Sequence, residues 1–263
     1  MTIKIYDNDG FGTTASMLIN AYNYVRIMKN RGVNIRVTNN SYSGCDEACG
    51  YDQATKDALD ALGNAGVLNV FAAGNDSRNV EGNPAFPASY TSPSILSVAA
   101  STSTDVRASF SNWGTSSVDL AAPGSGILST VMTAANYGSS SGTSMASPHA
   151  AGAAALLSSY NPNLSAASLK ATLMNTVDPL SQWNTLVKSG GRLNAANALQ
   201  NQTVCSFNLS NNSIRVPTKG GTFSVNVTAA QNCDAEVKSN AKWIQITGAN
   251  TLSGSGPVTF RVT

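Results

Sequence analysis

Three short apolar runs constrain the fold more than any other feature of this 263-residue sequence. Residues 67–73 are almost continuously apolar, and residues 95–99 and 118–121 have a similar pattern. A strand with one solvent-exposed face alternates apolar and polar residues, whereas a continuous apolar run is typical of a strand covered on both faces. The runs therefore predict a buried, mostly parallel sheet.

Helical periodicity separates these runs. Thr13 is placed to cap a helix that reaches about residue 29, and a second helix is expected over residues 51–62. A long helix rich in Ala and Gly follows, from about Ser144 to Tyr160. Ser165 is placed to cap a further helix, whose inward-facing residues are predicted to be Leu169, Leu173 and Met174.

Two more strands, over residues 3–6 and 33–39, complete the alternation of strands and helices. This order predicts an α/β fold with a doubly wound, mostly parallel sheet over residues 1–200. The texture changes after Leu199, and residues 200–204 read as a linker. Short alternating segments such as 223–227 then predict a second domain over residues 205–263, a small all-β sandwich.

Composition excludes several classes of function. Charged residues make up only 11% of the chain, the net charge is +2, and there is no run of Lys or Arg to bind nucleic acid. The longest apolar helix segment, residues 150–157, is far shorter than the roughly 18 residues of a membrane span. A surface rich in Ser, Thr and Asn instead suits an extracellular protein.

The four cysteines fall into two local pairs, which favours disulfides Cys45–Cys49 and Cys205–Cys233 in an oxidising compartment. Four free thiols in a cytosolic protein are the alternative. Zinc is less favoured, because the single histidine, His149, lies near neither pair. Residues 1–6 do not resemble a signal peptide, so a secreted protein would have lost one or would begin upstream.

The strongest chemical signal is the string Gly-Thr-Ser-Met-Ala-Ser-Pro-His over residues 142–149. A serine at a helix start presents its hydroxyl at a turn, beside backbone N–H groups that can hold a developing negative charge. The alternative for a shorter string would be a simple helix-capping serine. The full string resembles the nucleophile motif of the subtilisin-like serine proteases, which implies that Ser144 is the nucleophile.

Further segments resemble the same family in the right order. Residues 70–75 resemble the strand end that supplies the oxyanion-hole amide, which implies that role for Asn75. Residues 37–44 resemble the strand that pairs with substrate. The implied substrate-binding residues are Ser41, Tyr42, Ser43, Ala72, Ala73 and Gly74. Residues 118–124 and 191–195 extend the resemblance to about residue 200.

The family's base histidine and its orienting aspartate precede the serine, and the sequence contains neither of the segments that carry them. His149 lies five positions after Ser144, roughly 140° around the helix, and is expected to be structural. Asp7 and Asp9 are expected to be turn residues. We therefore expect the family's first strand and histidine helix upstream of Met1, and at most weak activity from this chain.

Residues 205–263 resemble a small Ig-like module of the BACON-like type, which implies carbohydrate or mucin as a partner. Trp243 could form a sugar platform, although a core position is the more common role for such a residue. The protease chemistry needs no cofactor and no metal. Structural calcium is frequent in the family, but no residue here can be assigned to it.

Three functions follow from these observations. The first is a serine endopeptidase that forms an acyl-enzyme on Ser144. The second is a non-catalytic pseudoprotease that binds peptides. The third is a carbohydrate-adhesion protein with a degenerate enzyme domain.

Overall fold

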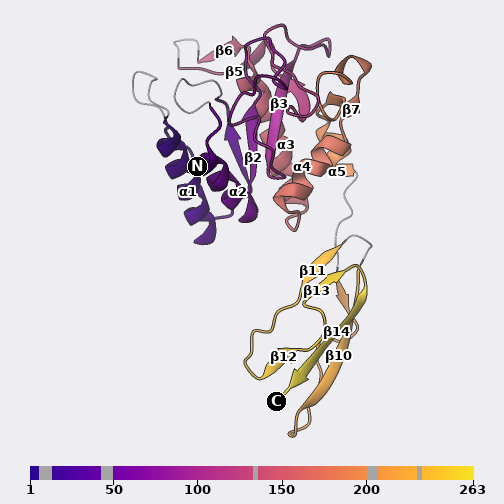
Figure 1. Ribbon diagram of the computed structural model, residues 1–263. Coiled ribbons are helices and arrows are strands. Elements are labelled where there is room, and N and C mark those ends of the chain that lie inside the picture. The colour runs from indigo at the N-terminus through magenta and orange to yellow at the C-terminus, as the bar shows by residue number, and fades with distance from the viewer. Residues whose placement is uncertain (6–13, 43–49, 133–135, 201–206, 230–232) are drawn as a thin grey trace. The chain divides into compact units, whose positions relative to one another are not determined.

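The structure is a computed structural model that describes residues 1–5, 14–42, 50–132, 136–200, 207–229 and 233–263 (Figure 1). The chain forms two compact units, Met1–Asn201 and Gln202–Thr263. The first unit holds a six-stranded sheet with helices on both faces, and the second holds short antiparallel strands. No helix among the described residues is long and apolar enough to cross a membrane.

The sheet of the first unit has the order β1-β2-β3-β4-β8-β7. Its strands are β1 (Val37–Asn40), β2 (Leu68–Ala72), β3 (Ile95–Ser101), β4 (Leu120–Pro123), β8 (Gly191–Arg192) and β7 (Asp178–Pro179). Every neighbouring pair from β1 to β8 is parallel, and only β7 runs antiparallel to β8. All residues of β2 and β3 are buried, as their continuous apolar runs predict. The predicted doubly wound α/β fold is confirmed.

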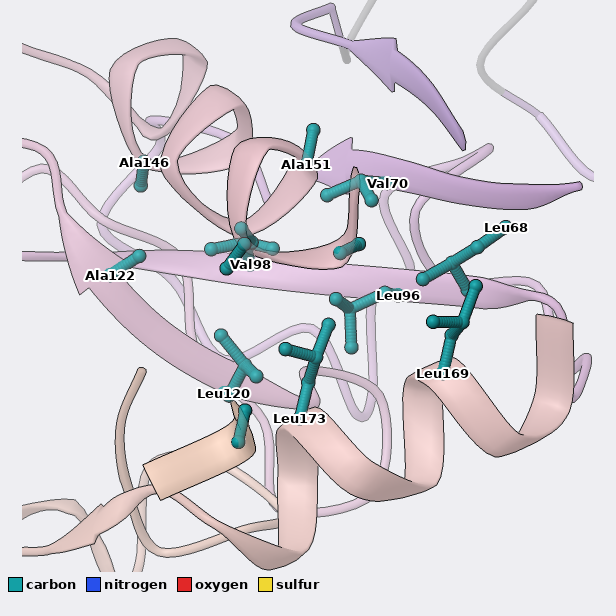
Figure 2. Packing of buried hydrophobic residues seen from close by; sticks show 14 of the residues in the cluster. Leu68, Val70, Leu96, Val98, Leu120, Ala122, Ala146, Ala151, Leu169 and Leu173 are labelled. Atoms are coloured by element: carbon teal, nitrogen blue, oxygen red, sulfur yellow. The ribbon is translucent and has the colours of Figure 1, made fainter. Parts of the chain in front are cut away.

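Helices cover both faces of the sheet. Successive residues of a strand point to opposite faces, so they pack against different helices. The helices are α1 (Ala15–Asn30), α2 (Gln53–Asn64), α3 (Thr143–Tyr160), α4 (Ala166–Asn175) and α5 (Ala195–Gln200). Phe71 packs with α1 and α2, whereas its neighbour Val70 packs with α3 and α4. Figure 2 shows the core that contains Val70. In it, Ala146 and Ala151 of α3 and Leu169 and Leu173 of α4 lie around Leu96 and Val98 of β3.

Several predicted boundaries need correction. Residues 3–5 belong to no strand, since they pair with no described neighbour, and Tyr6 lies outside the described residues. The cap of α1 is Thr14, which accepts the Met17 N–H, and Thr13 is not among the described residues. The strand predicted over residues 33–39 begins only at Val37, because Val33 and Ile35 still make turn bonds. Ser165 caps α4 as predicted.

Two small elements of the first unit were not predicted. They are the hairpin β5 (Ile127–Thr130) and β6 (Tyr137–Ser140), and the short 3₁₀ helix η1 (Ser181–Trp183). The hairpin strands are mostly exposed, so they lack the apolar pattern that identifies buried strands. Trp183 is fully buried, and its indole N–H donates to the Asp105 carbonyl at 2.7 Å.

The second unit contains two small antiparallel sheets. One has the order β12 (Ile244–Ile246), β14 (Gly256–Val262), β10 (Gly221–Thr228) and β9 (Asn208–Leu209), and the other pairs β11 (Asp234–Glu236) with β13 (Thr251–Ser253). Trp243 is 56% exposed, so the core position expected as its more common role is wrong. Cys233 is buried and disulfide-bonded, while Cys45, Cys49 and Cys205 lie outside the described residues.

A buried ion pair ties α4 to the sheet. Lys170 Nζ lies 2.9 Å from Asp119 Oδ2, which also accepts the Ser97 N–H at 2.8 Å. Asp119 is only 4% exposed, and burial raises the pKa of its carboxyl despite the attraction of Lys170. Removing one partner of such a pair leaves an uncompensated buried charge.

We expect Lys170→Met to lower the free energy of unfolding by about 3 kcal/mol or more, because Asp119 would lose its counter-charge. Urea unfolding followed by tryptophan fluorescence measures this change. Adding Asp119→Asn should recover more than half of the loss, since the neutral amide still accepts the Ser97 N–H. Equal stability of the single and double variants would contradict a paired buried charge.

A second ionic group holds the far edge of the sheet. Arg192 on β8 binds Asp105 through Nη1 and Asp178 through Nη2, the latter at 2.5 Å. The hydrogen bond from Asn194, together with the Arg192 guanidinium, holds the pKa of the Asp178 carboxyl below its usual range. A carboxyl with a lowered pKa in the folded state stabilises the fold above its unfolded pKa of about 3.9.

We therefore expect Asp178→Asn to cost about 1 kcal/mol at pH 7, since the pair is partly exposed. The gap from the parent chain should close as the pH falls below about 4 and Asp178 becomes protonated in both states. Urea midpoints at a series of pH values test this. Asp57→Asn, on an exposed face of α2, is the matched control for the loss of one carboxylate charge.

Candidate active site

Ser144 lies where several parallel strands end. It is the second residue of α3, and the ends of β1 and β2 lead to Ser41, which bonds to Ser144, and to Gly74, which bonds to Thr143. Sites in open α/β sheets gather at the carboxyl ends of the strands, because the connecting loops there can carry polar groups. The structure thus brings together Ser41, Gly74, Asn75 and Ser144, which are widely separated in sequence.

Ser144 and Ser41 exchange two hydrogen bonds. The Ser144 hydroxyl donates to the Ser41 carbonyl oxygen at 3.1 Å, and the Ser41 hydroxyl donates to the Ser144 carbonyl oxygen at 2.8 Å. A serine becomes a strong nucleophile only when a base takes its proton. A backbone carbonyl accepts a hydrogen bond but takes no proton at neutral pH. In this arrangement the hydroxyl is positioned but not activated.

Pro148 explains why Ser41 can bind there. In a regular helix the Ser144 carbonyl would accept the N–H of the residue four positions on, but residue 148 is a proline and has no N–H. The carbonyl therefore needs another donor, which the Ser41 hydroxyl supplies. The proline in the motif thereby couples the start of α3 to the end of β1.

The amide of Asn75 is fixed in orientation by Thr143. Its Oδ1 accepts the Thr143 N–H at 2.8 Å and the Thr143 hydroxyl at 2.9 Å. The hydroxyl itself accepts the Gly74 N–H at 3.1 Å, so its own proton is free to point at Asn75. Two donors on one side identify that atom as the oxygen. The Nδ2 donor must then face the other way.

Two N–H donors flank one point beside Gly142. A methyl group built on Gly142 would lie 3.5 Å from Asn75 Nδ2 and 3.6 Å from the Ser144 nitrogen. The Ser144 N–H belongs to the first turn of α3, where amides have no acceptor within the helix. The helix dipole adds partial positive charge at the same end. The arrangement is suited to hold a negatively charged oxygen.

Asn112 holds the loop that carries Asn75. It is fully buried, and its Oδ1 accepts the N–H groups of Asp76 and Arg78 at 3.0 and 3.2 Å. Its Nδ2 donates to the Ala73 carbonyl at 3.0 Å, and its own N–H donates to the Gly74 carbonyl at 2.9 Å. Gly74 has φ of +103°, a conformation that favours glycine. Asn112 therefore fixes the loop after β2 from its buried side.

Gly124 allows the segment before Ser144 to pack closely. The Gly142 N–H donates to the Gly124 carbonyl at 2.8 Å. A Cβ on Gly124 would lie 2.6 Å from the Ala100 Cβ and 2.8 Å from the Gly142 carbonyl oxygen, which is closer than real atoms approach. Only glycine fits between β3 and the motif.

The remaining predicted substrate-binding residues lie after β1 and at the end of β2. Tyr42 donates to Asn40 Oδ1 at 3.0 Å. Ala72 and Ala73 are buried, and the N–H groups of Ala73 and Gly74 are bonded to Val98 and Thr143. A bound peptide backbone would therefore find no free N–H at Ala73 or Gly74, and both residues are buried. Ser43 lies outside the described residues.

His149 does not belong to this group. Its side chain is exposed, and Nδ1 lies 2.8 Å from the Met145 carbonyl oxygen on the preceding turn. The structural role expected for His149 on α3 agrees with this contact. The described part of the chain also contains no group of three His, Cys, Asp or Glu side chains that could hold a metal ion.

Thr143, Asn112 and Gly124 were not predicted as site residues. The motif string contains Thr143, but its role depends on Asn75, 68 positions away along the chain. Asn112 follows a turn and precedes Trp113-Gly114, a pattern too common to single out one asparagine. The sequence signal that could have identified Thr143 as a site residue is its position directly before the predicted nucleophile.

Comparisons with known proteins agree with this geometry. The model of the subtilase family matches residues 1–204. The chain is 37% identical to thermitase of Thermoactinomyces vulgaris over 200 residues, which is 76% of this chain and 64% of that protein. It is 44% identical to subtilisin-like protease 7 of Arthroderma gypseum over 158 residues, 59% of this chain and 36% of that protein.

A solved structure shows the same fold. The crystal structure of a cold-adapted subtilisin-like serine proteinase matches with a TM-score of 0.57 and 34% identity, covering 73% of this chain and 63% of that one. The chain thus spans between about a third and two thirds of these relatives. With a family match over most of its length and the Ser144 motif at the strand ends, the chain belongs to the subtilase family.

Proposed function

We propose that the Ser144 site is the acyl-transfer centre of a serine endopeptidase of the subtilisin type. The observation that carries the proposal is the double donation from Thr143 to Asn75 Oδ1, at 2.8 and 2.9 Å. Asn75 Nδ2 and the Ser144 nitrogen lie 3.5 and 3.6 Å from the position that a Cβ on Gly142 would take. A pair of preorganised donors beside a serine hydroxyl is what acyl transfer requires.

The reaction would proceed in two halves. The Ser144 oxygen attacks the carbonyl carbon of a peptide bond, and the carbonyl oxygen becomes negative between Asn75 Nδ2 and the Ser144 N–H. The amine then leaves with a proton, forming an ester on Ser144, which water hydrolyses. Both halves need a base for proton transfer, and the observed acceptor of the Ser144 proton is the Ser41 carbonyl. This chain by itself should therefore react slowly.

The substrate would be a polypeptide that reaches Ser144 beside Ser41 and Tyr42. Ser41 and Tyr42 are partly exposed at the end of β1, whereas the buried Ala72 to Gly74 would support the site from within the fold. Cofactors are not required in this proposal, and structural calcium remains a prediction without an assigned site. We also propose an extracellular location, supported by the disulfide at Cys233, for which Cys205 remains the predicted partner.

Labelling by a fluorophosphonate tests the site. We expect slow labelling of Ser144, with fluoride as the leaving group, located by mass spectrometry of the adduct. Added imidazole should raise the rate, because it supplies the missing base in solution. Rapid labelling without imidazole would contradict the low activity proposed for this chain, and labelling that persists in Ser144→Ala would contradict the assignment of the nucleophile.

Two variants separate the oxyanion donors from the fold. Asn75→Ala should slow imidazole-assisted labelling by about 100- to 1000-fold, the usual cost of losing such a donor. Thr143→Val removes one of the two bonds that orient Asn75, and it also removes the acceptor of the Gly74 N–H. It should cost about tenfold or more, since each hydrogen bond contributes about 1 kcal/mol. Asp57→Asn serves again as the surface control. Equal rates in Asn75→Ala and the parent chain would remove the basis for the proposal.

A second function, carbohydrate or mucin binding, is favoured by one feature of the second unit. Trp243 is 56% exposed beside a shallow depression of about 370 Å³. Polar side chains line the same depression, namely Ser239, Asn240, Lys242 and Gln245. An exposed indole face with polar neighbours can stack on a sugar ring while hydroxyls bond to the rim. A non-catalytic peptide-binding role for the first unit would accompany this alternative.

A glycan array probed with the full chain tests the alternative. We expect Trp243→Ala to abolish any binding, because the stacking surface is lost. Val216→Ala, at another exposed apolar residue of the same unit, should leave binding unchanged. Binding that survives Trp243→Ala would show that this depression is not the sugar site.

A further inference from the structure

The four-stranded sheet of the second unit has one apolar face and one polar face. Its strands β12, β14 and β10 lie side by side (Figure 1), and successive residues of each strand point to opposite faces. Phe223 and Phe260 are paired across β10 and β14, and their ring centroids lie 6.1 Å apart on the apolar face. Their chain neighbours Thr222 and Arg261 must then point to the polar face.

Arg261 has a defined set of neighbours on this polar face. It is paired with Gln245 on β12 and with Thr222 on β10, so the three residues form one row across the sheet. Residues directly opposite in antiparallel strands have Cβ atoms about 4.5 to 5.5 Å apart. Trp243 lies two positions before Gln245, and its carbonyl accepts the Thr263 N–H at 3.1 Å. Trp243 is therefore the diagonal neighbour of Arg261, at a separation that long side chains can bridge.

The positive charge on the polar face lacks a counter-charge. Arg261 is the one charged residue in the described strands β10, β12 and β14, and it forms no ion pair with any acid that the structure describes. Lys242 is also exposed, has no ion-pair partner within the same described residues, and lines the depression beside Trp243. Glu236 is already paired with Lys238, at 2.8 Å. An anion is therefore the favoured ligand of this face.

The indole ring of Trp243 is separate from these positive charges. Its side chain is 56% exposed, and the cation–π contact found among the described residues joins Arg107 to Trp113, in the first unit. An exposed aromatic ring can pack on the C–H face of a sugar. A guanidinium pairs with two oxygens of a carboxylate or of a similar oxyanion. The two groups can therefore hold different parts of one ligand.

We propose that this face binds an acidic sugar, one that carries a carboxylate or a sulfate group, and that Arg261 selects the charge. The proposal rests on the sugar-binding function proposed above for Trp243 and adds the class of sugar. Trp243 would stack on the sugar ring, and Arg261 would form paired hydrogen bonds with the acidic group. Gln245 and Thr222, on either side of Arg261, would bond to adjacent hydroxyls. Lys242 would add a second positive charge at the rim.

Three matched probes test the proposal with the full chain. They are polyacrylamide polymers that carry lactose, 3′-sialyllactose or lactose 3′-sulfate. We expect at least one charged polymer to bind about tenfold or more tightly than the lactose polymer in biolayer interferometry, because a hydrogen bond between charged groups is stronger than a neutral one. Binding of the sialylated polymer alone would identify a carboxylate, and binding of the sulfated polymer alone would identify a sulfate.

A set of arginine variants tests the role of Arg261. Arg261→Gln should weaken binding of the charged polymers by about tenfold or more, to the level of the lactose polymer. Arg261→Lys keeps the charge but loses the paired geometry, so its binding should be intermediate. Arg215→Gln, at an exposed arginine of the same unit outside these strands, is the matched control and should have no effect. Equal binding of all three polymers, or equal loss in Arg261→Gln and Arg215→Gln, would overturn the proposal.

Other outcomes distinguish this proposal from the sugar-binding function on which it rests. Binding of a neutral glycan that is lost in Trp243→Ala but unchanged in Arg261→Gln would support sugar binding and reject the acidic class. Poly-L-glutamate tests the effect of charge alone. If it displaces the charged polymers and their binding survives Trp243→Ala, the face attracts anions without recognising a sugar. Absence of binding by both charged polymers would also reject the proposal.

Discussion

The contact between Thr143 and Asn75 is the interaction on which the site depends. Two bonds from one residue hold the Asn75 oxygen, so the amide cannot rotate without losing both. The donors are themselves held, because Thr143 is fully buried and its hydroxyl accepts the Gly74 N–H. Asn75 is exposed, yet its amide is held in a single orientation, as the amide of a buried asparagine usually is. This is the preorganisation that makes N–H donors effective for a developing charge.

That contact needs the close packing of four strand ends. Gly124 brings the segment before α3 against β3, and Asn112 fixes the loop after β2 from the buried side. Pro148 frees the Ser144 carbonyl for the Ser41 hydroxyl, which joins the end of β1 to the same centre. These contacts use backbone N–H and C=O groups that have no hydrogen-bond partner within their own strand or helix. The site is therefore built from the unsatisfied ends of the fold.

Much of this could be predicted where a residue's burial depends on its own neighbours in sequence. The apolar runs placed β2 and β3 to within about two residues, because strands buried on both faces tolerate few polar residues. The motif string placed Ser144 at the start of α3 for the same local reason. By contrast, Asn112 acts through residues 34 to 39 positions away, and no local pattern encodes such a pairing.

The failures are also physical. Residues 3–5 have the composition of a strand, but a strand requires a partner, and composition does not show whether one is present. Trp243 is apolar enough for a core, yet a unit of this size cannot cover every large side chain. Sequence patterns record what a segment can do, whereas pairing and burial depend on what lies beside it.

The state of Ser144 follows from the same reasoning. A hydroxyl at a helix start will donate to the best available acceptor, and here that acceptor is the Ser41 carbonyl at the end of β1. Among the described strands β1 has β2 on one side only, so the nucleophile's partner directly follows an edge strand of the sheet. The position of the Ser144 hydroxyl therefore depends on a residue that follows β1 and not on α3 alone.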